Sequence, residues 1–212
     1  MLRLSGRCMH YKIVIASTNE GKIREIHKIL DALEGLKIDV RSLKDFNIPE
    51  PDEPHHSFME NAIHKAKYYA QHTKLPTLSE DSGLSIEALN GFPGVRTKEF
   101  GIECGGLGLA KTFIKLAEML KETGNYTACF NSATVLYIPS HDYLITHEAK
   151  DDGTLTFPPR GDDGFAYDPV FVPKGYDKTF AELGLEVKNK ISHRAQAMQG
   201  LVEKFRQFLA EN

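Results

Sequence analysis

Two adjacent carboxylates and a hydroxyl group stand together near the middle of the chain. Glu80, Asp81 and Ser82 follow the apolar run 75–78 and precede Gly83. Buried acids destabilise a fold unless they have a partner, and oxygen ligands of this kind suit Mg²⁺, which is usually held by one or two carboxylates together with substrate phosphates. The segment therefore predicts a Mg²⁺ site. The alternative is a solvated acidic turn in which Gly83 takes a positive φ.

A second polar segment, residues 17–22, has the composition of a phosphate-binding loop. It lies between a β-branched run at 11–16 and a segment with apolar residues at helical spacing, Ile23, Ile26, Leu30 and Leu33. Free N–H groups and the helix dipole attract anions at a helix N-terminus. We therefore expect phosphate contacts here, although the P-loop pattern is absent. The alternative is an N-cap with a solvated lysine. The segment consists of Ser17, Thr18, Asn19, Glu20, Gly21 and Lys22.

Glu60 has two possible roles. Ser57 is a suitable N-cap, and Glu60 three residues later would complete a capping box for a helix whose buried face includes Ala62 and Ala66. The same carboxylate, near the helix N-terminus, could instead be a metal ligand beside Asp81. The sequence does not separate the two roles.

Two further segments have side chains suited to binding a ligand, and the first of them could hold a base. The loop 158–169 contains glycines, acids and the aromatic residues Phe165 and Tyr167, which predicts a ring for stacking and a carboxylate for hydrogen bonding. Ser192 is a natural N-cap, which places His193 and Arg194 in the first turn of the last helix. The helix dipole disfavours cations there, so their presence indicates an anionic or carbonyl-bearing ligand.

The elements that must position these groups alternate between strand and helix. We expect strands at 11–16, 36–40, 127–138, 144–148 and 170–172, an extended proline-rich loop at 47–54, and helices after Gly21, Ser57, Gly108 and Ser192. The length suits one domain, with residues 1–9 as an extension ahead of the first strand.

Composition excludes several classes of protein. The chain has 29 acidic and 26 basic residues, with no long run of like charge, which argues against a duplex nucleic-acid surface. The cysteines Cys8, Cys104 and Cys129 are widely spaced, so neither a disulfide framework nor a zinc site is expected, and a reducing cytoplasm fits best. No apolar run approaches membrane-spanning length.

Five motifs occur in an order and spacing that resemble the inosine/xanthosine triphosphate pyrophosphatase family over nearly the whole chain. They are 17–22, Glu60-Asn61-Ala62, 80–84, 164–169 and Ser192-His193-Arg194. The resemblance implies an α/β fold with an elongated mixed β-sheet, flanking helices and two lobes around a central active-site cleft. It also implies Mg²⁺-dependent hydrolysis of ITP, dITP or XTP to the monophosphate and pyrophosphate, usually by a homodimer.

The resemblance also assigns roles by motif. It makes Asp81 the proton acceptor and a metal ligand, with Glu60 and Glu80 helping to hold Mg²⁺. The triphosphate would be bound by Ser17 to Lys22 and by Ser82. The base and sugar would be held by Phe165, Ala166, Tyr167, Asp168, Lys188, His193 and Arg194. Ala166 departs from the glycine usual at its position in the family.

Two rival functions remain open at this stage. One is a pyrophosphatase for modified pyrimidine or ordinary nucleotides, and the other is a catalytically silent nucleotide-binding module. The Glu80-Asp81 pair and Lys22 argue against the nucleotide-binding module. Without a metal ion, carboxylates that face the phosphates would weaken nucleotide binding by charge repulsion.

Overall fold

A six-stranded mixed β-sheet forms the centre of the protein, in a computed structural model that describes residues 9–31, 36–106 and 110–211. The strand order is β2-β1-β3-β4-β5-β6. The strands are β1 (Met9–Ile15), β2 (Leu36–Ser42), β3 (Thr77–Ile86), β4 (Thr127–Ile138), β5 (Tyr143–Leu155) and β6 (Phe171–Pro173). β1 runs parallel to β2 and β3, whereas β3 to β6 pair antiparallel. The expected mixed sheet is confirmed.

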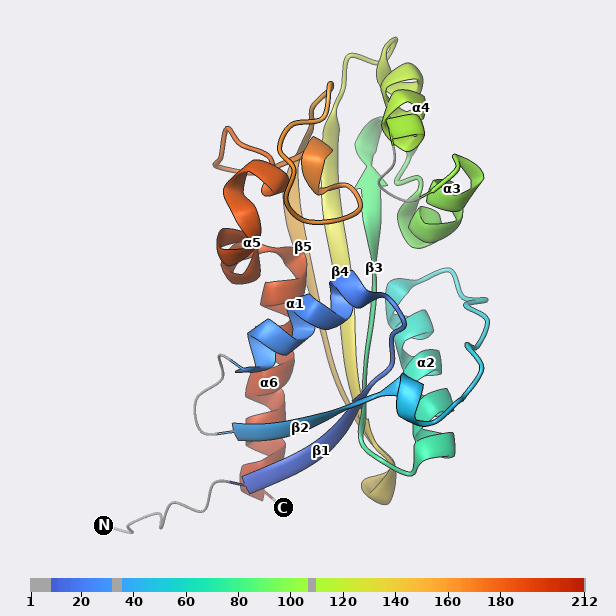
Figure 1. The fold of residues 1–212 in the computed structure, drawn as a ribbon, viewed down its shortest axis with the longest axis vertical. Helices are drawn as coiled ribbons and strands as arrows, with labels where there is room; N and C mark the ends of the chain where they lie inside the picture. Colours follow the sequence, from blue (N-terminus) through green and yellow to red (C-terminus); the bar gives the residue numbers. More distant parts are fainter. Residues whose placement is uncertain (1–8, 32–35, 107–109, 212) are drawn as a thin grey trace, which may run out of the picture.

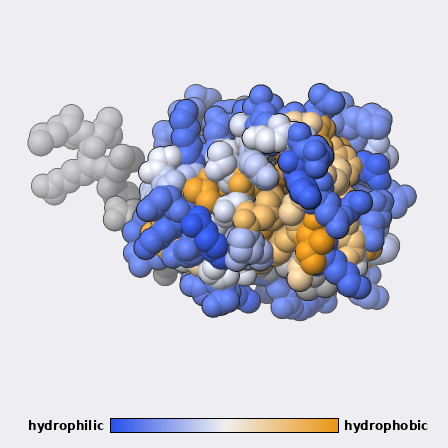
Figure 2. All heavy atoms as spheres, turned by 90° about the horizontal axis from the view of Figure 1, so that it is seen from above, coloured by the Kyte–Doolittle hydropathy of each residue, from blue (hydrophilic) through white to orange (hydrophobic). Residues whose placement is uncertain are grey.

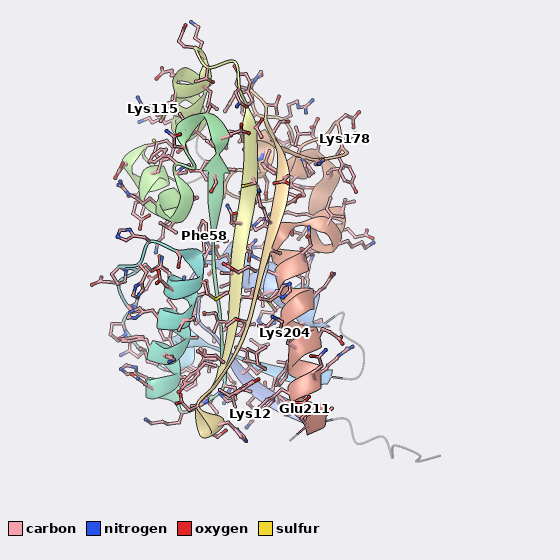
Figure 3. All side chains as sticks on the ribbon, turned by 180° about the vertical axis from the view of Figure 1, so that it is seen from behind. Lys12, Phe58, Lys115, Lys178, Lys204 and Glu211 are labelled. Atoms are coloured by element: carbon pink, nitrogen blue, oxygen red, sulfur yellow. The ribbon has the colours of Figure 1, made fainter. Side chains whose placement is uncertain are left out.

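Helices cover both faces of this sheet (Figure 1). They are α1 (Glu20–Asp31), α2 (Phe58–Thr73), α3 (Thr97–Glu103), α4 (Ala110–Leu120), α5 (Phe180–Ile191) and α6 (His193–Glu211). Seen from behind, the long strands β4 and β5 run between α2, which begins at the labelled Phe58, and α6, which carries the labelled Lys204 (Figure 3). α2 packs through Ala62 and Ala66 on Ala133 and Val135 of β4, while α6 packs on the opposite face.

Two separate apolar clusters lie along the sheet, and they correspond to the two expected lobes. One contains Ile13, Ile26 and Leu136 with the apolar face of α6. The other contains Leu84, Phe113 and Phe171 near the end that carries α3 and α4. Seen from that end, apolar side chains gather in the middle of a largely polar surface (Figure 2).

Several sequence predictions need adjustment. Residues 78–84 lie inside β3 rather than in a turn, which excludes the solvated-turn alternative. β1 begins at Met9, earlier than expected, and the rest of the expected extension, residues 1–8, lies outside the described residues, as does Leu33. β5 extends well beyond 144–148, and the sequence analysis missed α3 and α5.

Two further observations concern the apolar character of the helices and the state of the cysteines. None of the helices in the described part of the chain combines the length and the apolar character needed to cross a bilayer. Within the same part of the chain, Cys104 and Cys129 are free thiols.

Asp151 is a carboxylate on an apolar face of β5, and it generates a prediction about pH. Successive side chains of a strand point to opposite faces, so Asp151 lies on the same face of β5 as Ile145 and Leu155. Its neighbour across the strand pair is Phe130 of β4. Burial, helped by the charge of Asp152, raises the pKa of Asp151 to about 7. Its Oδ2 has no hydrogen-bond partner among the described residues.

We expect Asp151→Asn to stabilise the protein at high pH. Because the folded-state pKa is raised, ionisation of Asp151 costs stability above pH 7, and this cost disappears as the pH falls from 7 towards 4. The gain in unfolding free energy should be about 1–2 kcal/mol at pH 8, allowing for partial exposure. Urea denaturation of both proteins at pH 4.5 and pH 8 measures it. A gain of equal size at both pH values would contradict this account.

Candidate active site

The parallel pairing of β1 with β3 brings the two polar segments of the sequence together. Val14 and Ile15 pair with Thr77 and Leu78, and the Ala16 N–H donates to the Leu78 carbonyl at 2.7 Å. The chain leaving β1 at residues 17–19 must therefore lie beside residues 79–82 of β3. Asn19 then starts α1, since its Oδ1 accepts a hydrogen bond from the Lys22 N–H at 3.1 Å.

These segments line a cavity of about 140 Å³, which we call the phosphate-side cavity. Its walls come from the loop after β1, the start of α1, the proline-rich loop, α2, β3, and the start of α3 with the segment that leads into it. The lining residues are Ala16, Ser17, Thr18, Asn19, Lys22, Glu50, Glu53, Lys65, Tyr69, Glu80, Asp81, Ser82, Val95, Thr97 and Lys98.

Asp81 is held by two side chains of α2. Lys65 donates to Asp81 Oδ1 at 3.0 Å, and Asn61 donates to Asp81 Oδ2 at 3.4 Å. The same Lys65 ammonium contacts Glu53 at 2.6 Å, so one buried cation joins two carboxylates. Burial raises the pKa of Asp81 despite the opposing charges of Lys65 and Lys22. A carboxylate with a raised pKa is a better proton acceptor than an ordinary one.

Glu80 lies on the other face of β3 and has cationic partners of its own. Lys22 lies 2.9 Å from Oε2 and Arg194 lies 3.1 Å from Oε1, while the Ser132 hydroxyl donates to Oε1 at 3.0 Å. Burial alone would raise the pKa of Glu80, but the charges of Arg194 and Lys22 hold it far below its usual range. Glu80 is therefore permanently ionised, and it fixes Lys22 at the cavity wall.

A second cavity, which we call the base-side cavity, adjoins the first and has about 50 Å³ of free volume. The two cavities share the lining residues Asn19, Lys22, Ser82 and Thr97. The remaining wall comes from Gly83, Phe130, Phe165, Ala166, Tyr167, Asp168, Lys188, His193 and Arg194. All seven residues predicted to hold a base and a sugar are thus brought together here.

Glu25 links the cations of this second cavity. Its carboxylate contacts Lys188 at 2.7 Å and also bonds Arg194, and all three side chains are almost fully buried. Lys188 also donates to Asp168 at 2.7 Å, and Arg194 donates to Ser82 at 3.1 Å. The side chains of Asp168, Lys188, Glu25, Arg194 and Glu80 therefore form one continuous chain of opposite charges.

The structure corrects the reasoning about the first turn of α6. The anions that neutralise Arg194 are the protein's own Glu25 and Glu80, so its position does not by itself require a ligand. Burial and the neighbouring Arg194 hold the pKa of His193 well below its usual value, so the ring is neutral. It stacks on Phe130, with ring centroids 4.6 Å apart. A neutral ring at this position avoids the unfavourable helix dipole.

The two aromatic residues of the 158–169 loop have different environments. Tyr167 is fully buried in the apolar cluster with Phe113, so its ring is not free to stack on a ligand. Phe165 is the ring next to the cations of the cavity. Ala166 takes a φ of 54°, a left-handed conformation that favours glycine.

Three predicted site residues are not part of either cavity wall. Glu20 is exposed and pairs with Lys44 at 3.2 Å, and Gly21 lies in the first turn of α1. Glu60 is exposed, and its Oε2 accepts a hydrogen bond from the Ser57 hydroxyl at 2.8 Å. The Glu60 side chain thus contacts the N-cap residue Ser57, without the bond to the N-cap backbone N–H that would complete a capping box.

Other residues of the site were not predicted from the sequence. Glu53 and Glu50 belong to the proline-rich loop, and Lys65 and Glu25 lie on helices among apolar neighbours. A signal existed for Glu25, because it lies four residues before Ile29, at helical spacing, on the buried face of α1. A charged residue in such a stripe needs a buried partner.

Comparisons with known proteins agree with this geometry. The model of the Ham1 family matches residues 13–204. A protein named dITP/XTP pyrophosphatase from Aquifex aeolicus is 43% identical, covering 90% of this chain and 95% of the relative. One of the same name from Caulobacter vibrioides is 40% identical, covering 91% of this chain and 97% of the relative.

Solved structures give the same result. The HAM1 protein from Coxiella burnetii has a TM-score of 0.79 at 34% identity, covering 95% of this chain and 100% of the other. The Staphylococcus aureus Ham1 protein has a TM-score of 0.76 at 29% identity, covering 92% of this chain and 98% of the other.

The buried position of Arg194 gives a prediction about stability. We expect Arg194→Ala to lower the unfolding free energy by about 3–5 kcal/mol, because it leaves Glu25 and Glu80 buried without their shared cation. Arg24→Ala, at an exposed position of α1, is the control and should change it by less than about 0.5 kcal/mol. Chemical denaturation measures both. A loss for Arg194→Ala no larger than the control's would show that the charge chain is not structural.

Proposed function

The chain belongs to the Ham1 family, and from this premise we propose that it hydrolyses non-standard purine nucleoside triphosphates, namely ITP, dITP and XTP, to the nucleoside monophosphate and pyrophosphate. The observation that carries the proposal is the pair of adjoining cavities with a shared wall. A nucleotide whose base lies in one cavity extends its phosphates past Lys22 and Ser82 into the other. Relatives named dITP/XTP pyrophosphatase supply the substrate class.

The donor set fits Mg²⁺ when it is bound together with substrate. Among the described residues, no three carboxylate, imidazole or thiol groups converge as a complete metal site. Mg²⁺ needs no such cage, because it commonly takes one or two carboxylates and completes its shell with phosphate oxygens and water. Asp81 and Glu53 would hold it, since both already face one cation, the Lys65 ammonium. Glu80 would contribute charge from the opposite face of β3.

When bound, Mg²⁺ would neutralise phosphate charge and assist the attack of water on phosphorus. Asp81 accepts the proton of the attacking water, a role that suits its raised pKa. Lys22 donates hydrogen bonds to phosphate oxygens on which negative charge accumulates. Asn61 and Lys65 orient the Asp81 carboxylate. No covalent nucleophile is needed.

Base selection follows from donors placed at the base-side cavity. Hypoxanthine and xanthine carry a 6-oxo acceptor where adenine carries an amino group, so the cations Lys188 and Arg194 favour the former. Their positions are set by Glu25, which makes this carboxylate part of the discrimination. Guanine shares the 6-oxo group, so its exclusion depends on the 2-amino group and the loop around Phe165 to Asp168.

The family resemblance also supports the wider setting of the proposal. We propose that the whole chain acts as one pyrophosphatase domain, as a homodimer, in the cytoplasm. The single continuous sheet beneath both cavities supports the first part. Composition supports a small-molecule substrate rather than nucleic acid or a membrane.

A substrate panel tests the proposed function. We expect pyrophosphate release from ITP, dITP and XTP to exceed release from GTP, UTP and TTP, and to require Mg²⁺. Asp81→Asn should lower kcat by about 10²–10⁴ because the general base is lost. Preferred cleavage of UTP or TTP would identify a pyrimidine nucleotide enzyme instead, and binding without cleavage would identify a nucleotide-binding module.

A matched pair of variants tests which glutamate holds the metal. Glu53→Gln should raise the Mg²⁺ concentration for half-maximal activity about tenfold, because it removes one of two carboxylates at Lys65. Glu60→Gln should leave that concentration unchanged, since the Glu60 carboxylate is exposed and accepts a hydrogen bond from Ser57. Mg²⁺ titrations of initial rate decide between them. The reverse result would restore Glu60 as the ligand.

A further inference from the structure

The base-side cavity is too small for the base that it is expected to bind. Its free volume is about 50 Å³. A cavity of about 150 Å³ is the size that binds benzene, and a purine has two fused rings. Typical small-molecule pockets enclose about 300–1,000 Å³. Something in the free protein therefore occupies the space that a purine would need.

The side chain of Phe165 occupies this position. Its ring centroid lies 4.5 Å from the Lys188 ammonium and 5.5 Å from the Arg194 guanidinium carbon. Cations at such distances are attracted to the face of an aromatic ring. The ring thus contacts the same two donors that a 6-oxo purine would use.

Gly21 makes this position of the ring possible. A Cβ at Gly21 would lie 3.0 Å from both Cγ and Cδ1 of Phe165 and 3.2 Å from Asn19 Oδ1. Gly21 lies in the first turn of α1. A side chain at this position would be in close contact with the Phe165 ring.

The backbone around Phe165 is a tight turn with one firm anchor. Gly164 and Ala166 on either side take φ values of 87° and 54°. The Phe165 N–H donates to Asp168 Oδ2 at 2.8 Å, and Lys188 donates to the same oxygen. These bonds hold the backbone of the turn at Asp168. Displacement of the Phe165 ring therefore requires only rotation of its side chain and a local change in the turn.

We propose that Phe165 is a plug that closes the base-side cavity in the free protein and that an incoming purine base displaces its ring. The proposal rests on the proposed function, because it names the purine as the displacing ligand. The bound base then contacts the Lys188 ammonium and the Arg194 guanidinium in place of the Phe165 ring. Affinity is then reduced by the fraction of molecules in which the plug is closed.

Rapid-mixing measurements of IMP binding test the plug. Phe165→Ala should raise the association rate of IMP at least tenfold. Tyr176→Ala, at an exposed ring outside both cavities, is the matched control and should change nothing. An unchanged association rate with faster dissociation in Phe165→Ala would mean that the ring only stacks on a bound base, and would overturn the proposal.

A second measurement tests the plug without any nucleotide. The chain contains no tryptophan, so Phe165→Trp and Tyr176→Trp each introduce a single reporter. In the free protein, acrylamide should quench the reporter at 165 several-fold less than the one at 176. Equal quenching would overturn the proposal whether or not the enzyme cleaves ITP. Shielded fluorescence at 165 in a protein that cleaves no purine triphosphate would instead retain the plug and remove the proposed function.

Discussion

The structure depends on a chain of buried opposite charges. Asp168, Lys188, Glu25, Arg194 and Glu80 contact one another in sequence, and Lys22 continues the chain into the phosphate-side cavity. Removing any interior member leaves a charge uncompensated in a low-dielectric interior, which costs far more than an exposed ion pair gains. The chain therefore fixes α1, α5, α6 and β3 relative to one another, and it holds the cations of both cavities in place.

One strand, β3, positions polar groups on both faces of the sheet. β3 presents Asp81 on one face and Glu80 on the other, since successive residues of a strand alternate. Asp81 meets Lys65 of α2, whereas Glu80 meets Arg194 of α6. The two adjacent acids thus connect helices that cover opposite faces of the sheet. One acid is left with a raised pKa and the other is permanently ionised.

Several side chains that look like ligand contacts in the sequence are used within the protein. Tyr167 packs in the core, and Glu60 accepts a hydrogen bond from Ser57, the N-cap residue of α2. Arg194 neutralises two carboxylates, and Gly21 accommodates an aromatic ring. Phe165, which lies beside these cations, is the side chain that we propose to leave the cavity. The same buried network that fixes Lys188 and Arg194 provides the surface on which that ring rests.

The sequence by itself determined the elements, the acidic pair and the polar segments, because hydrophobic period, capping residues and turn residues lie within short stretches of chain. The order and spacing of the motifs over nearly the whole chain indicated the family and, through it, the mixed sheet. Only the tertiary structure decided that Glu53 rather than Glu60 faces Lys65, and that Glu25 joins Lys188 to Arg194. Those contacts join residues far apart in the chain. The contacts of Glu25 depend on the packing of α1 against α5 and α6, which no local pattern encodes.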